Sequence, residues 1–123
     1  MSKIDEKGRI PYEIANEWAK NWQKFIEPFN EKSPEDKPFF PKAYLLKREQ
    51  IEMLLKYSED IRVYFGMDEN KNNHLMLVGV DKDGNDILPN HSGKRKDGSS
   101  EPGEVLNKTK PCPFWCDAEG GLG

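Results

Sequence analysis

Apolar residues recur every three or four positions near the start of the chain, and this spacing predicts a first helix. The apolar positions are Ile14, Ala15, Trp18, Ala19, Trp22, Phe25, Ile26 and Phe29, with polar and charged residues between them. One apolar stripe on a 3.6-residue period is typical of an amphipathic helix. Pro11 suits a helix start and Pro28 cannot continue the backbone hydrogen bonds, so we expect this helix over residues 11–27.

The spacing changes after a proline-rich, charged stretch at residues 30–42, which predicts a loop. One ring of the Phe39-Phe40 pair in this loop is expected to reach the core. Residues 43–46 are apolar enough for a short strand. Residues 47–56 return to helical spacing, with Ile51, Leu54 and Leu55 on one side, and predict a second helix.

A two-residue alternation then predicts a β-hairpin over residues 61–80. Ile61, Val63 and Phe65 alternate with Arg62 and Tyr64, which is typical of a strand with one dry face. Residues 75–80 are apolar on both faces and indicate a central strand, and the polar run 68–73 supplies the turn. Residues 86–89 are expected to form a last, short edge strand.

These elements predict an α+β fold, in which both helices pack on one face of a small antiparallel sheet. The opposite face is expected to carry Arg62, Tyr64, Met76 and Val78. Such a mixed surface is too apolar to face only water, so we expect the tail of the chain, a second copy or a partner protein to cover it.

The pattern divides the chain into three parts. Residues 1–9 read as a charged, frayed leader, and residues 10–89 as a single α+β domain. Residues 90–123 lose all periodicity and have few large apolar side chains, so they predict a polar, largely irregular arm. This arm contains the motif PCPFWC at residues 111–116.

Charge and composition remove several classes of partner. Charged residues make up 33% of the chain, but the net charge is only −3 and neither sign dominates, which argues against a nucleic-acid binder. The basic run 94–96 reads as a solvated loop. The sequence has no apolar segment of secretory or membrane-spanning type, so we expect a cytoplasmic protein with reduced thiols.

The hairpin also resembles a group of small uncharacterised bacterial proteins. The residues that carry the resemblance are the run IRVYFGMD at 61–68, the run VGVDKDGND at 78–86 and the cysteine- and proline-rich C-terminus. The resemblance implies no known activity. It implies only that the hairpin and the Cys-Pro tail belong together.

Residues 81–86 (DKDGND) invite a calcium interpretation, which the spacing rejects. An EF-hand loop with Gly84 at its sixth position would place Gly79 at the first ligand position and Asn90 at the last. A β-turn that leaves a strand explains the same residues. No serine or cysteine is paired with a histidine at a recognisable spacing, and no Gly-rich phosphate loop occurs, so we expect neither an enzyme nor a cofactor.

The two cysteines leave open a thiol-dependent metal-binding or redox protein. Cys112 and Cys116 are separated by three residues, and His91 is the histidine nearest in sequence to them. A structural zinc site needs four ligands, and the remaining histidine, His74, sits at the mouth of the hairpin. This interpretation is therefore the alternative.

The aromatic residues of the tail favour protein binding. Pro113 restricts the backbone, and Phe114 and Trp115 offer large anchors of the kind that dominate interfaces. The same rings could instead pack on the protein's own sheet. The sequence thus predicts a small non-enzymatic interaction module that binds another protein or a second copy of itself, through Arg62 and Tyr64 on the sheet and Pro113, Phe114 and Trp115 in the tail.

Overall fold

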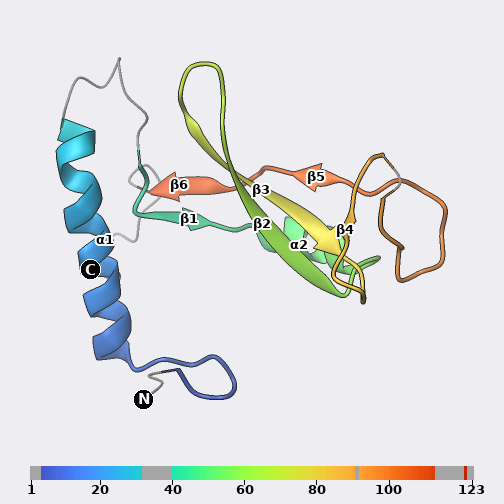
Figure 1. Cartoon of the computed structure of the whole chain (residues 1–123), viewed down its shortest axis with the longest axis horizontal. Coiled ribbons are helices and arrows are strands. Elements are labelled where there is room, and N and C mark those ends of the chain that lie inside the picture. Colours follow the sequence, from blue (N-terminus) through green and yellow to red (C-terminus); the bar gives the residue numbers. More distant parts are fainter. Residues whose placement is uncertain (1–3, 32–39, 91, 113–120, 122–123) are drawn as a thin grey trace. The chain divides into compact units, whose positions relative to one another are not determined.

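The computed structural model describes residues 4–31, 40–90, 92–112 and 121. The described elements are α1 (Tyr12–Glu31), β1 (Ala43–Leu45), α2 (Arg48–Leu55), β2 (Asp60–Met67), β3 (Asn73–Val80), β4 (Asp86–Ile87), β5 (Val105–Leu106) and β6 (Lys110–Cys112) (Figure 1). The chain divides into a first unit, Met1–Ala43 with Pro111–Gly123, and a sheet unit, Tyr44–Lys110. The α+β class predicted from the sequence is confirmed.

Strand β3 is the centre of a four-stranded sheet in the sheet unit. β2 pairs with it antiparallel along its full length, from Asp60 opposite Val80 to Met67 opposite Asn73. β4 and β5 share the other edge of β3, where Ile87 lies opposite Gly79 and Leu106 opposite Leu77. The predicted hairpin is therefore confirmed, and β4 is shorter than the predicted 86–89 strand. β1 and β6 form a separate two-stranded sheet.

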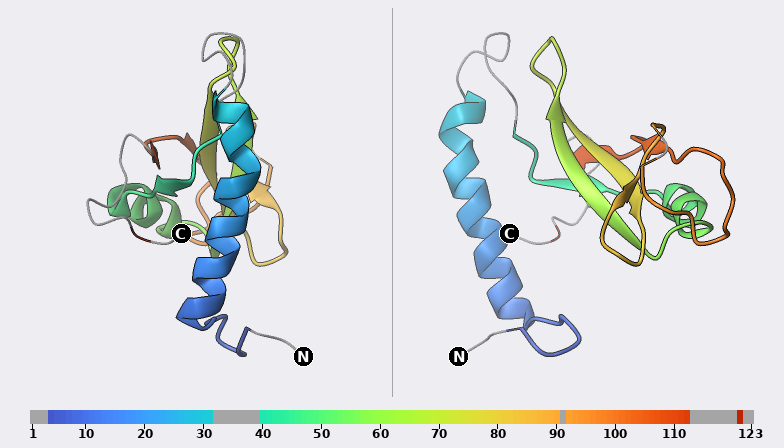
Figure 2. Two further views of the ribbon diagram at one scale, coloured as in Figure 1. Left: turned by 90° about the vertical axis from the view of Figure 1, so that its left-hand side faces the viewer. Right: turned by 45° about the vertical axis from the view of Figure 1, so that its right-hand side comes forward.

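Helix α2 packs on one face of this sheet, as its apolar spacing predicts (Figure 2). The buried cluster beneath it consists of Leu54, Tyr57, Leu77 and Ile87, with Ile61 and Leu106 packed around it. Residues directly opposite each other in a sheet point to the same face, so Arg62, Tyr64, Met76 and Val78 share the other face, as predicted.

Helix α1 belongs to the first unit and runs farther than expected, because Pro28 lies inside it instead of ending it. Contacts beyond the proline offset its cost, which is about 3 kcal/mol in a helix interior. The Phe29 ring packs against the Phe40 ring at 5.7 Å. The Asn30 side chain accepts a hydrogen bond from the Phe40 N–H at 3.0 Å and donates one to the Phe40 carbonyl at 2.9 Å. Phe40 thus packs on α1, where Trp22 also contacts it.

Three turns of the chain are built in the same way on an aspartate. The carboxylates of Asp5, Asp68 and Asp81 each accept the backbone N–H groups two and four residues later, at 2.8–2.9 Å. The backbone of each aspartate also bonds to the residues three and four positions on. The residue three positions after the aspartate has a positive φ in every turn: Gly8 at 82°, Lys71 at 65° and Gly84 at 85°. The turn predicted at residues 81–86 is confirmed, and it explains these acidic residues without calcium.

The segment after β4 is more ordered than its sequence predicts. Residues 92–104, here called the 92–104 loop, lie within the arm predicted from the sequence and pack on Tyr57. The Tyr57 carbonyl accepts the Lys96 N–H at 2.6 Å, and its hydroxyl accepts the Glu104 N–H at 3.0 Å. The loop leads into β5, and both belong to the sheet unit, Tyr44–Lys110.

Replacing Tyr57 by phenylalanine should lower the free energy of unfolding by about 1 kcal/mol, because the part-buried Glu104 N–H loses its acceptor. For a domain of this size the melting temperature should fall by about 4–8 °C per kcal/mol. Tyr12→Phe is the matched control, since Tyr12 is 65% exposed. Equal melting temperatures for the two variants in calorimetry would contradict this assignment.

Replacing Lys71 by glycine should stabilise the protein by about 1 kcal/mol, because a side chain in the left-handed region is strained. Lys82→Gly, at the second position of the Asp81 turn, should instead destabilise it slightly by adding freedom to the unfolded chain. Urea midpoints measure both changes. A lower midpoint for Lys71→Gly would refute the shared turn design.

Candidate interaction surface

The outer edge of β2 is a long strand edge at the border of the four-stranded sheet. Among the described strands, none pairs with this edge. Natural edge strands are usually short, or carry proline or lysine that prevents further pairing. β2 is eight residues long and contains neither of these residues. It therefore keeps a row of backbone donors and acceptors open for another strand.

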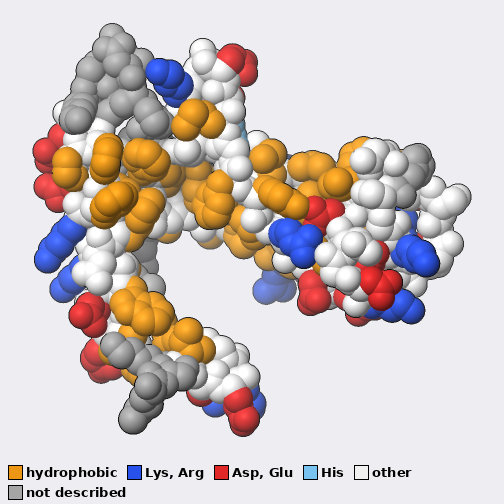
Figure 3. Space-filling model, viewed as in Figure 1, with side chains coloured by type: hydrophobic (Ala, Val, Ile, Leu, Met, Phe, Trp, Pro, Cys, Tyr) orange, Lys and Arg blue, Asp and Glu red, His pale blue; other side chains and the backbone are white. Residues whose placement is uncertain are grey.

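Three apolar side chains of this strand are exposed. They lie on the same face as Ile61, which packs against the cluster beneath α2. Phe65 is 82% exposed, Met67 53% and Val63 39%. Figure 3 shows hydrophobic side chains at the surface over the β2–β3 hairpin and over α1. The sequence predicted a dry face at Ile61, Val63 and Phe65. The three share the face that α2 packs on, but the burial predicted for Val63 and Phe65 is wrong. An eight-residue helix is about 12 Å long and an eight-residue strand about 27 Å, so α2 leaves the distal half of that face open.

Arg62 and Tyr64 lie on the opposite face, where both bind Asp86 of β4. The Arg62 Nη1 lies 2.5 Å from the Asp86 Oδ1, and the Arg62 Nη2 donates to the Gly84 carbonyl at 3.1 Å. The Tyr64 hydroxyl donates to the Asp86 Oδ2. The hydrogen bond to Asp86 raises the pKa of both Arg62 and Tyr64 above their ordinary values.

This polar bridge crosses β3 above two buried valines. Arg62 is opposite Val78 and Asp86 is opposite Val80, all on the same face. Val78 and Val80 are only 2% and 5% exposed. At the β4 end, side chains of the sheet itself therefore cover this face, where the sequence predicted the tail, a second copy or a partner protein.

His74, Asp68 and Asn107 form a second polar cluster near the tip of the hairpin. The His74 Nε2 is 2.8 Å from the Asp68 Oδ2, and the Asn107 Nδ2 is 3.3 Å from the His74 Nδ1. The hydrogen bond from His74 and those from the Asn72 and Asn70 N–H groups lower the pKa of Asp68 to about 2. Both ring nitrogens of His74 form hydrogen bonds, so we infer that the cluster stabilises the hairpin turn.

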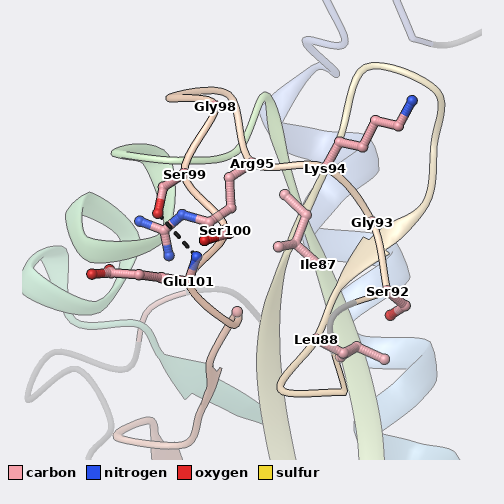
Figure 4. Close-up of a pocket in the computed structure, with 11 residues that line it drawn as sticks. Ile87, Leu88, Ser92, Gly93, Lys94, Arg95, Gly98, Ser99, Ser100 and Glu101 are labelled. Atoms are coloured by element: carbon pink, nitrogen blue, oxygen red, sulfur yellow. Dashed lines mark hydrogen bonds between the residues drawn. The ribbon is translucent and has the colours of Figure 1, made fainter.

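A cavity of about 440 Å³ lies within the 92–104 loop (Figure 4). Arg95 is the largest charged side chain in it, and each of its three nitrogens donates a hydrogen bond. The guanidinium binds the Asp97 carboxylate at 2.9 and 3.2 Å and the Pro102 carbonyl at 3.2 Å, and it stacks 4.2 Å from the centre of the Tyr57 ring. The Ser99 hydroxyl accepts the Glu101 N–H at 3.0 Å. These bonds of Arg95 and Ser99 hold the loop together, and Lys94 and Glu101 are the other charged residues that line the cavity.

The remaining predicted site residues fall outside what the structure describes. His91, Pro113, Phe114, Trp115 and Cys116 are not described, and only the backbone of Cys112 is, within β6. Within the described part of the chain, no three His, Cys, Asp or Glu side chains gather as a metal site would require. No described helix has the length and apolar character needed to cross a membrane.

Comparison with protein-family models, with curated proteins and with solved structures finds no match to this chain. The resemblance to small uncharacterised bacterial proteins stays a prediction from the sequence.

Acid should destabilise the hairpin turn through Asp68. Its folded pKa of about 2 is below its ordinary value of 3.8, so its ionised form stabilises the fold fully above about pH 4. That contribution is lost as the pH falls through about 2. Asp68→Asn should therefore flatten the loss of stability between these pH values in urea titrations. Equal slopes for wild type and Asp68→Asn would contradict the assignment.

Proposed function

We propose that this chain is a small non-enzymatic interaction module that binds an extended segment of another polypeptide along the outer edge of β2. The added segment would continue the sheet by main-chain hydrogen bonds, and Val63, Phe65 and Met67 would supply its apolar contacts. Pro113, Phe114 and Trp115 of the tail are proposed to contact the same partner, on the strength of their sequence alone.

The exposure of Phe65 carries this proposal. A phenylalanine that is 82% exposed on a long, unprotected edge strand is a liability for an isolated protein, because it favours unplanned pairing. A binding strand needs this combination of open backbone and apolar side chains. Arg95 and His74 are engaged in bonds within the protein itself, so neither carries a competing proposal.

Photo-crosslinking from position 65 tests the proposal. A photoreactive phenylalanine analogue replaces Phe65 in the full chain, and the protein is irradiated in the cells that produce it. We expect a discrete covalent adduct with a polypeptide, identified by mass spectrometry, that disappears when Val63 is also changed to lysine. The matched control carries the analogue at Leu55, which is exposed on α2. Adducts no stronger at position 65 than at position 55 would overturn the proposal.

A further inference from the structure

We propose that the segment bound by β2 is β2 of a second copy of this chain, so that two sheets join into one through a twofold axis. This inference rests on the proposed function and identifies the polypeptide that β2 binds. Closed twofold dimers are the most frequent assemblies of soluble proteins, and their interfaces must be complementary to themselves. The sequence of β2 meets this requirement.

The symmetry restricts the pairing to a few registers. A twofold axis perpendicular to the sheet makes the two β2 strands antiparallel and keeps each face continuous across the junction. Residues directly opposite each other must then come from the same face, so a residue of β2 lies on the axis opposite its own copy. The two registers that use nearly all of β2 place either Val63 or Tyr64 on the axis.

The Val63 register opposes apolar side chains on one face and brings no like charges together on the other. On the α2 face, Val63 meets its copy and Ile61 meets Phe65, which gives three directly opposite apolar pairs. On the other face, Arg62 lies opposite Tyr64 of the second copy, and both side chains keep their bonds to Asp86 of their own copy. Aromatic and β-branched pairs across strands stabilise a sheet.

The Tyr64 register is disfavoured by charge. It places Asp60 opposite Asp68 twice, once on each side of the axis. The pKa of Asp68 is held at about 2, so this carboxylate is ionised at neutral pH. Like charges directly opposite each other destabilise a strand pair. The Val63 register opposes no two like charges over residues 59–67, and we assign it to the dimer.

A second copy also fits the surface in extent. It brings an edge of the same eight-residue length and the same division into an apolar and a polar face. The apolar side chains that β2 leaves in water are Val63 and Phe65 near the axis and Met67 at its end. In the dimer, Val63 and Phe65 are covered by Val63 and Ile61 of the second copy. Helix α2 does not extend to the Met67 end of β2 in either copy.

Disulfide trapping in the full chain tests the register. In the Val63→Cys variant the two opposite Cα atoms are about 4.5–5.5 Å apart, within the range that a disulfide bridges. Met67→Cys is the matched control, because its two copies lie eight residues apart along the strands. We expect a disulfide between two copies of residue 63, identified by peptide mapping without reduction, and none between copies of residue 67. Trapping at neither position, or equally at both, would overturn the assigned pairing.

Sedimentation equilibrium separates this inference from the proposed function. Wild-type protein should show a concentration-dependent mass approaching two chains, and Phe65→Lys should lose it while remaining folded. A wild-type monomer at every concentration would overturn the second copy as the partner. The proposed function would still stand if the photoreactive residue at position 65 then captured a different polypeptide, and it would fall if it captured none.

Discussion

The ordered part of the sheet unit depends on the burial of Tyr57. Its ring completes the cluster with Leu54, Leu77 and Ile87, while its hydroxyl and carbonyl bind the two ends of the 92–104 loop. Arg95 stacks on the same ring from the loop side. A segment with almost no large apolar residues is thereby tied to a residue of the core through both its backbone and its side chain.

The close approach of the loop also requires a glycine. A Cβ at Gly103 would lie 2.0 Å from the Ile87 carbonyl oxygen, so no larger residue fits where the loop passes β4. The Asp81 carboxylate adds a further tie, because it accepts the Lys94 N–H at 3.0 Å as well as closing its own turn. The loop is therefore ordered by backbone hydrogen bonds and steric fit, with little hydrophobic burial of its own.

This distinction explains what the sequence could and could not predict. Regular burial produces a periodic pattern of apolar residues in the sequence. This pattern predicted the hairpin, α2 and the face shared by Arg62 and Tyr64. Backbone hydrogen bonds to a distant tyrosine produce no periodic pattern of apolar residues. The packing of the 92–104 loop on Tyr57 could therefore not be predicted from the sequence. The length of α1 was missed for a related reason, since Asn30 and Phe40 support the helix beyond Pro28 from ten residues away. At the candidate surface, the sequence identified the apolar positions of β2, but their exposure follows from the mismatch in length between β2 and α2.

The aspartate turns have a consequence for the order in which the molecule assembles. Each closes within five residues and needs no contact from elsewhere in the chain. The entropy lost in closing so short a segment is small, so the Asp68 turn and the β2–β3 hairpin are expected to form early. The 92–104 loop can dock only after α2 and the sheet have buried Tyr57. Between these two events the far edge of β3, which β4 and β5 later occupy, is as open as that of β2. During that interval a growing chain has two unpaired edges instead of one.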